Sequence, residues 1–140
     1  MYDVQLVLKA LTPEMELAFR GPSLVVQDMP FRIGRESRDP RTARSLPPDL
    51  HERRANQSPR SNDLYIVDPG PRLFISRQHL LIERRENGFF LVDLFSACGT
   101  IVEGKVVGGD HRGGEVPLEH QDVIIIGTAA SPIIFKVLMV

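Results

Sequence analysis

Two short segments carry side chains that could bind an anion. Gly34-Arg35 places a guanidinium directly after a glycine, at the end of an apolar run. Further along the chain, Ser76, Arg77 and His79 place a hydroxyl, a second guanidinium and an imidazole within four residues. A guanidinium is shaped to fork around phosphate oxygens, and a hydroxyl adds another donor. These residues therefore predict a local anion site that suits a phosphate group.

A catalytic interpretation of the same residues has less support. A Ser76–His79 pair would need a third group to orient the imidazole and an oxyanion hole, and no Gly-x-Ser-x-Gly elbow is present. The four histidines, at positions 51, 79, 111 and 120, fall at no recognised metal-ligand spacing. Cys98 is more easily understood as a half-buried loop residue than as a reactive thiol. No P-loop motif occurs. We expect no enzyme, no metal site and no cofactor.

Composition indicates one ordinary soluble domain. The chain has 140 residues, of which 42% are apolar and 25% charged, and it is long enough to bury a core. A formal net charge of −1 gives no overall basic field to attract nucleic acid or an anionic membrane. A single cysteine excludes an intrachain disulfide, and we find neither a secretion signal nor a membrane-spanning stretch. We expect a cytoplasmic protein with one domain over residues 1–140, which could itself be a module of a longer chain.

Short apolar runs separated by turn residues predict an all-β fold. They lie at 4–11, 23–27, 31–35, 64–67, 80–84, 89–93, 100–102, 104–107, 115–118, 123–126 and 133–139. Asn87-Gly88, between two of these runs, is a strong hairpin signal. Residues 13–21 are open between a strand and a loop with one buried face, because Met15, Leu17 and Phe19 alternate. About ten or eleven short strands without a convincing helix predict a two-sheet β-sandwich.

Residues 36–62 differ in character from the rest of the chain. They contain six arginines against four acids, with four prolines and very few apolar residues to bury. Such a stretch is either a mobile insertion or a partly ordered functional loop, and both interpretations stay open. Its charges nearly balance and no aromatic residue is available for base stacking, which argues against nucleic-acid binding.

Taken in order, the motifs resemble those of the forkhead-associated (FHA) domain, a reader of phosphothreonine peptides. The Gly-Arg of that family appears as Gly34-Arg35, and its Ser-Arg-x-His as Ser76–His79. Its Asp-x-x-Ser-x-Asn-Gly-Thr segment appears as Asp93–Thr100, followed by Glu103-Gly104 in place of Asn-Gly. The resemblance covers most of the chain. It implies two stacked sheets whose loops hold the peptide at one end.

The resemblance also implies roles for individual residues. It assigns phosphopeptide binding to Arg35, Ser76, Arg77, Cys98, Gly99 and Thr100. It assigns structural support of the site to Gly34, His79, Glu103 and Gly104. Within these sets, Arg35 and Ser76 would contact the phosphate, and His79 would pack beneath the site and fix its loop.

The chain departs from the family pattern where the peptide is held. Cys98 replaces an asparagine that holds the peptide backbone, and Ala97 replaces a residue that is often polar. Glu103 replaces a second asparagine, and a carboxylate near a phosphate would repel it. The insertion at residues 36–62 falls between Arg35 and Ser76, so we expect it at the binding end.

We expect a module that binds a phosphothreonine-containing protein segment made by a Ser/Thr kinase, in signalling or assembly. The alternative is a scaffold of the same fold that binds a protein partner without phosphate. Neither nucleic acid nor membrane is an expected partner, and the oligomeric state is open.

Overall fold

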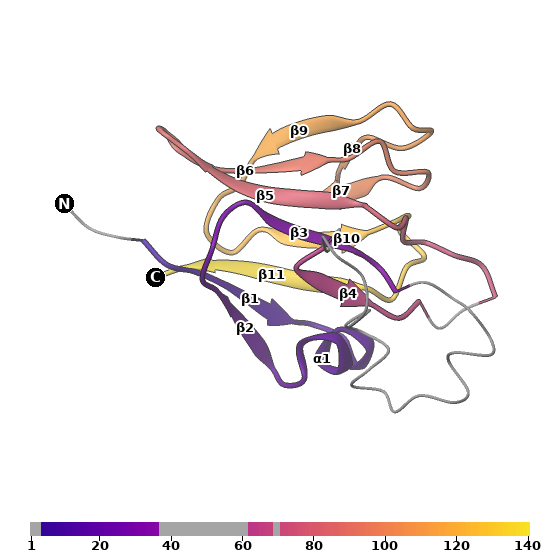
Figure 1. Ribbon diagram of the computed structural model, residues 1–140, viewed down its shortest axis with the longest axis horizontal. Helices are drawn as coiled ribbons and strands as arrows, with labels where there is room; N and C mark the ends of the chain where they lie inside the picture. Colours follow the sequence, from indigo (N-terminus) through magenta and orange to yellow (C-terminus); the bar gives the residue numbers. More distant parts are fainter. Residues whose placement is uncertain (1–3, 37–61, 69–70) are drawn as a thin grey trace.

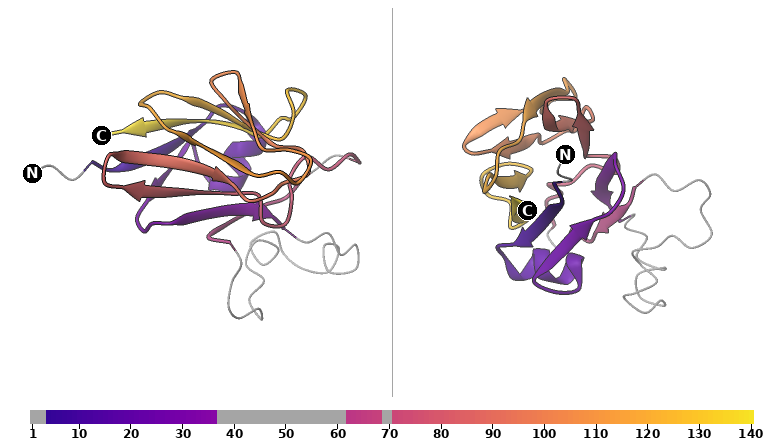
Figure 2. Two further views of the ribbon diagram at one scale, coloured as in Figure 1. Left: turned by 90° about the horizontal axis from the view of Figure 1, so that it is seen from above. Right: turned by 90° about the vertical axis from the view of Figure 1, so that its left-hand side faces the viewer.

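Two β-sheets stack face to face in the computed structural model, which describes residues 4–36, 62–68 and 71–140 (Figures 1 and 2). One sheet has six strands in the order β2-β1-β11-β10-β7-β8, and the other has five in the order β4-β3-β5-β6-β9. The strands are β1 (Leu6–Ala10), β2 (Ser23–Val26), β3 (Phe31–Arg35), β4 (Leu64–Ile66), β5 (Leu80–Arg85), β6 (Gly88–Asp93), β7 (Thr100–Val102), β8 (Lys105–Val107), β9 (Gly114–Pro117), β10 (Val123–Ile126) and β11 (Ile134–Met139). The predicted all-β sandwich of short strands is confirmed.

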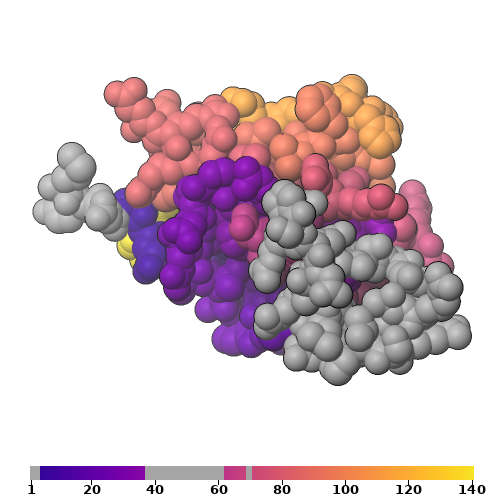
Figure 3. Space-filling model, in the orientation of Figure 1, coloured from indigo at the N-terminus to yellow at the C-terminus, as the bar shows by residue number. Residues whose placement is uncertain are grey.

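Alternating side chains explain why these strands form two layers. In β6, Phe89 and Leu91 are buried while Phe90 is only partly so, and β10 buries Ile124 and Ile126 in the same way. Successive residues of a strand point to opposite faces, so the buried sets meet between the sheets. Figure 3 shows one face of the molecule. Much of this face is formed by the segments from β2 to β3 and from β5 to β6.

The predicted hairpin around Asn87-Gly88 is present. Strands β5 and β6 pair antiparallel from Leu80↔Asp93 to Arg85↔Gly88. This register carries β6 to the end of the sandwich where β3 also finishes, since β3 pairs antiparallel with β5. The hairpin therefore aligns the two segments that carry the predicted site.

One element was not predicted: residues 13–21 contain a helix, α1 (Pro13–Phe19), rather than a strand or a loop. Thr12 caps its N-terminus, with the Thr12 hydroxyl accepting from the Met15 amide at 3.3 Å, and Pro13 begins the first turn. Its inward side chains are Met15, Ala18 and Phe19, at helical spacing, while Leu17 is 76% exposed. The alternation of apolar residues was misleading because Ala18, a small residue, completes the buried stripe.

Most of the predicted insertion at residues 36–62 lies outside the described residues. Its two ends, Glu36 and Asn62, are described and both are buried. Within the described ranges, no helix is long and apolar enough to cross a membrane.

The orientation of α1 can be tested by placing the same carboxylate on its two sides. Ala18→Asp should lower the free energy of unfolding by about 3 kcal/mol or more, because it buries an unpaired charge. Leu17→Asp should cost less than about 1 kcal/mol, because that position faces solvent. Urea unfolding followed by circular dichroism measures both. Equal losses for the two variants would contradict the helix.

Candidate functional site

Loops from both sheets meet at the end of the sandwich where β3 and β6 finish. The Arg35 amide donates to the Ser76 carbonyl at 2.9 Å, which joins the end of β3 to the loop before β5. The Ala97 amide donates to the Ser76 hydroxyl at 3.1 Å, which joins that loop to the one between β6 and β7. The Asp110 amide donates to the Ala97 carbonyl at 2.9 Å and adds the loop after β8. These loops carry the sequence-predicted binding residues.

Arg35, the last residue of β3, has a half-buried and oriented side chain. Its Nε donates to the carbonyl of Ile75 at 2.8 Å. Together with the bond from the Arg35 amide to Ser76, this fixes both the backbone and the plane of the guanidinium against the loop before β5. A guanidinium held in this way loses less freedom when it binds an oxyanion.

Gly34 is required because another backbone passes close to it. A Cβ atom on Gly34 would collide with the carbonyl of Arg77 and with the amide of Asn62. The same Arg77 carbonyl accepts from Asn62 Nδ2 at 2.7 Å, so Asn62 fixes the loop from the opposite side. The absence of a side chain on Gly34 thus lets Arg35 and Arg77 share one end of the sandwich, where Arg77 itself is exposed.

Ser76 holds its hydroxyl at the junction of two loops. The hydroxyl accepts from Ala97, and a hydroxyl has one donor besides its acceptor lone pairs. The Ser76 hydroxyl can therefore donate its hydrogen to an oxygen of an anion. The Ser76 side chain is half-buried, and the backbone on either side is held by Arg35 and His79.

His79 is fully buried, and its ring bridges the two loops. Its Nδ1 accepts from the Ser76 amide at 3.0 Å, and its Nε2 lies 2.8 Å from the Gly99 carbonyl, to which it must donate. These partners select the neutral tautomer with hydrogen on Nε2. Burial lowers the pKa of His79, although the Gly99 carbonyl and the Asp93 charge, 3.8 Å away, act in the opposite direction.

Asp93, at the end of β6, organises the loop that follows. Its Oδ1 accepts from the Ser96 amide at 2.9 Å, and its Oδ2 accepts from the hydroxyls of Ser96 at 2.7 Å and Thr100 at 2.9 Å. The Ser96 hydroxyl in turn accepts from the Gly99 amide at 2.9 Å. Asp93, Ser96 and Thr100 are buried, so this carboxylate is satisfied by its own loop rather than offered to a ligand.

This network places two predicted binding residues beneath the surface. Thr100 is fully buried and its hydroxyl is directed to Asp93. Gly99 is buried as well, with its amide bonded to Ser96 and its carbonyl to His79. Both residues hold the loop through these hydrogen bonds, and the Thr100 side chain does not reach the surface.

Cys98 lies between these buried residues and the surface. It is partly exposed, and its thiol lies 3.6 Å from the Leu73 carbonyl, to which it donates a weak hydrogen bond. Ala97 is exposed beside it. At this edge of the site, the chain therefore offers a thiol and a methyl group.

Glu103 and Gly104 lie at the other end of β7, in the turn to β8. Their φ values of 48° and 81° form the tight hairpin, and Glu103 Oε2 accepts from the Val123 amide at 2.7 Å. The length of β7, about 10 Å at 3.3 Å per residue, separates this turn from the loop of Gly99. The Glu103 carboxylate is therefore bonded to the backbone of β10, one short strand away from the loop of Gly99.

Three buried groups that fix the site were not predicted from the sequence: Asn62, Asp68 and Ser96. Asp68 Oδ2 accepts from the amides of Phe74 at 2.6 Å and Ile75 at 3.1 Å, which shapes the loop that receives Arg35. No local pattern in the sequence identifies Asp68, because its partners Phe74 and Ile75 lie six and seven residues further along the chain. Asn62 had no recognisable signal.

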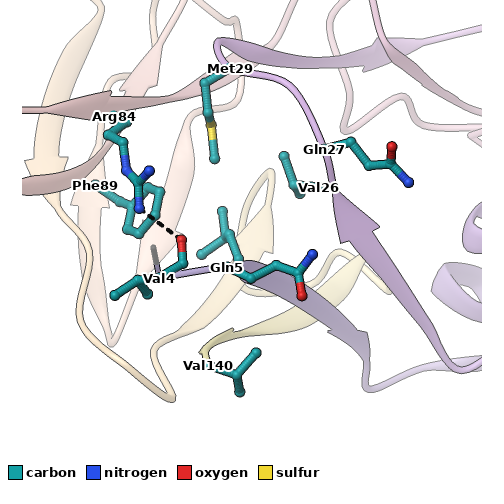
Figure 4. A pocket seen from close by; sticks show the side chains of 9 residues that line it. Val4, Gln5, Val26, Gln27, Met29, Arg84, Phe89 and Val140 are labelled. Atoms are coloured by element: carbon teal, nitrogen blue, oxygen red, sulfur yellow. Dashed lines mark hydrogen bonds between the residues drawn. The ribbon is translucent and has the colours of Figure 1, made fainter. Parts of the chain in front are cut away.

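A separate pocket lies at the opposite end of the sandwich (Figure 4). It has a volume of about 540 Å³ and is lined by Val4, Gln5, Leu6, Val26, Gln27, Met29, Arg84, Phe89 and Val140. Arg84 crosses it to donate to the Val4 carbonyl at 2.7 Å and stacks 4.9 Å above the Phe89 ring. None of the sequence-predicted site residues lines this pocket. No group of three or more potential metal ligands occurs in the described part of the chain.

The buried imidazole predicts a pH dependence. The unfolded chain takes up a proton near the ordinary histidine pKa of about 6.5, but folded His79 resists it because its pKa is lowered. Stability should therefore be complete above pH 6.5 and fall below it, by at most about 1.4 kcal/mol per pH unit.

Thermal unfolding between pH 7.5 and 5.5 measures this effect, with His79→Gln as the control. The variant should melt lower at pH 7.5, because its side chain cannot bridge the same two loops, and its profile should be flatter. A wild-type melting temperature that stays constant over this range would contradict a neutral His79.

Comparison with known proteins places the chain in a family. A sequence profile described as the FHA domain matches residues 31–127. The fold is similar to the FHA domain of the CT664 protein from Chlamydia trachomatis, with a TM-score of 0.58, 20% identity and 96% of each chain covered. It is also similar to the kinase-interacting FHA domain of the kinase associated protein phosphatase from Arabidopsis, with a TM-score of 0.59, 20% identity, and 99% of this chain and 96% of that one covered.

A third similar structure is Mycobacterium tuberculosis EmbR in complex with a low affinity phosphopeptide. It has a TM-score of 0.55 and 19% identity, and the match covers 97% of this chain and 24% of EmbR. No protein of curated function matches the sequence. The family profile spans more than half of the chain, including β3, the loop before β5 and the loop after β6, which carry the side chains predicted to bind an anion. The chain belongs to the forkhead-associated domain family.

Proposed function

We propose that this FHA domain binds phosphothreonine-containing protein segments and that Arg35 and Ser76 hold the phosphate. The observation that carries the proposal is the pair of bonds from Arg35 to the loop before β5, through its amide to Ser76 and through Nε to Ile75. They bring the guanidinium at the end of β3 and the Ser76 hydroxyl of the loop before β5 to the same junction. Such an arrangement suits an anion with several acceptor oxygens.

The strength of these contacts suits a phosphorylation switch. A phosphate monoester carries −1.5 to −2 charges near neutral pH and three strong acceptor oxygens. Each charge-assisted hydrogen bond to it would contribute roughly 1.5–3 kcal/mol. Loss of the phosphate would then weaken binding by at least about tenfold, because the unmodified threonine offers neither the charge nor the oxygens.

The residues around Arg35 and Ser76 have three roles in this proposal. Arg77 is exposed beside Ser76 and adds positive charge around the phosphate. Ala97 and Cys98 form the surface along which the peptide backbone runs. Gly99, Thr100 and His79 act beneath that surface, where their hydrogen bonds hold the loop in place.

The partner is a protein segment modified by a Ser/Thr kinase. The similar EmbR structure holds a phosphopeptide, and the similar Arabidopsis domain interacts with a kinase, which agrees with a phosphorylated protein ligand. Binding requires no chemical step by this chain, and we propose no catalytic role for Ser76 or His79. A cytoplasmic location and a role in signalling stay predictions.

A phosphate-independent scaffold is the second candidate, and Cys98 is the observation that favours it. The thiol stands at the edge of the site and is directed to the chain's own Leu73 carbonyl, so the peptide backbone loses a strong partner there.

Phosphopeptide binding distinguishes the two candidates. A degenerate phosphothreonine peptide pool should bind the wild-type protein in a fluorescence anisotropy titration, while the matched unphosphorylated pool should bind at least about tenfold more weakly. Arg35→Ala and Ser76→Ala should each weaken phosphopeptide binding by at least about tenfold, because each removes a charge-assisted bond. Leu17→Asp, which lies away from the loops, is the control. Equal affinity for both pools, unaffected by Arg35→Ala, would favour the scaffold.

Replacement of Cys98 should change affinity without changing the dependence on phosphate. Cys98→Asn introduces a side chain with both a donor and an acceptor for a peptide backbone. We expect phosphothreonine-peptide affinity to rise by about fivefold, the effect of one neutral hydrogen bond of about 1 kcal/mol. Cys98→Ala is the control and should leave affinity nearly unchanged. Weaker binding by Cys98→Asn would show that the thiol does not limit the peptide contact.

A further inference from the structure

The outer face of the six-stranded sheet carries many more apolar side chains than a solvated sheet face usually does. A row of isoleucine and valine crosses four neighbouring strands through the register pairs Ile134↔Ile125, Ile125↔Ile101 and Ile101↔Val106. The chain neighbours of Ile134, Ile125 and Ile101 are buried, and so is Val107 beside Val106, so the row itself faces outward. Val106, at the edge of the row, is 69% exposed.

Charged side chains lie in the next row of the same face. Lys9 on β1 pairs directly with Lys136 on β11, and Lys136 pairs with Val123 on β10. Glu103 continues this row, because its amide donates to the Val123 carbonyl at 3.0 Å. Neither lysine takes part in an ion pair with any residue of the described ranges. Like charges directly opposite one another on a sheet are destabilising. The Lys9–Lys136 pair therefore lowers the stability of a single chain, and none of the described residues forms an ion pair that compensates it.

The positions of Lys9 and Glu103 make the charges on this face complementary to those on the same face of a second copy. The midline of the six strands runs between β11 and β10. Lys9 on β1 and Glu103 at the end of β7 lie in the same row, one strand further out on either side of that midline. A two-fold axis along the midline, parallel to the strands, would therefore bring Lys9 of one copy opposite Glu103 of the other, twice.

We propose that this face binds a second copy of the chain. The same axis stacks Ile134 of each copy on Ile125 of the other, at the centre of the apolar row. Sheets pack in this aligned manner at about 10 Å, with strands within about 30° of each other. Each Lys9 gains a carboxylate, which offsets the unfavourable like-charge contact with Lys136.

The size of the face predicts reversible association. Six strands at about 4.8 Å span about 24 Å. The apolar row, the charged row and a third row through Val7↔Leu138 extend about 14 Å along the strands. This area is below the roughly 800 Å² per partner of a standard interface, so a weak dimer is expected. An axis parallel to the strands leaves the loops around Arg35 and Ser76 at the same end of both copies. If the proposed function holds, the dimer would present two phosphopeptide sites in one direction.

Sedimentation velocity of the full chain tests the proposal, at concentrations from about 10 μM to about 1 mM, the range in which a small interface associates. The wild-type protein should shift from monomer to dimer. Val106→Asp should raise the dimer Kd at least about tenfold, because it places a charge in the apolar row. Leu17→Asp, which adds the same charge on α1, should leave the Kd unchanged. A protein that stays monomeric at all concentrations, or a dimer whose Kd is unchanged by Val106→Asp, would overturn the proposal.

A charge exchange tests the pairing itself. Lys9→Glu and Glu103→Lys should each weaken the dimer, and the double variant should restore it, because the exchange recreates two opposite-charge pairs. Glu103→Gln keeps an acceptor for the Val123 amide but removes the charge, so it should weaken the dimer without lowering the melting temperature. Failure of the double variant, if folded by circular dichroism, to recover association would overturn the Lys9–Glu103 contact.

Discussion

The neutral imidazole of His79 joins the two loops on which the binding end depends. Its ring can accept from the Ser76 amide and donate to the Gly99 carbonyl only in one protonation state and one tautomer. Burial maintains that state by lowering the pKa of the ring. The position of the Ser76 hydroxyl therefore depends on a group that never reaches the ligand.

A second buried group, Asp93, extends this support through hydrogen bonds to Ser96 and Thr100. The cost of burying a carboxylate is offset by three donors from its own loop. His79, Asp93 and Ser96 are buried and bonded to other groups of the chain, while Arg77 is exposed at the surface. Rigid support of this kind lets a small number of contacts distinguish a phosphate from a hydroxyl.

Much of the fold was predictable because its signals are local. Alternation in Phe89–Asp93 and the Asn87-Gly88 turn require only neighbours in the chain to be recognised. Helix α1 was missed because the buried stripe includes a small residue, Ala18, so that the larger Leu17 dominated the pattern. The cap at Thr12 and the proline at the first helical position were the signals that could have identified it.

The site was predictable to a lesser extent, for a related reason. Gly34, Arg35, Ser76 and His79 were found through family motifs, and the structure brings all four to one end of the sandwich. Burial of Thr100 could not be deduced, because it depends on a carboxylate seven residues earlier. The bond from the Val123 amide to Glu103 could not be deduced either, because its two residues are twenty positions apart in the chain.

The most direct test of the account is an NMR titration of the isotope-labelled protein with a phosphothreonine peptide. The central claim is that the phosphate is held at the junction where Arg35 Nε bonds to the loop before β5 and the Ser76 hydroxyl meets the loop of Ala97. We predict that the Arg35 Nε–H signal and the backbone amides of Ser76 and Ala97 shift with the phosphorylated peptide and not with its unphosphorylated form. Shifts confined to other parts of the sandwich, or equal shifts with both peptides, would contradict the account.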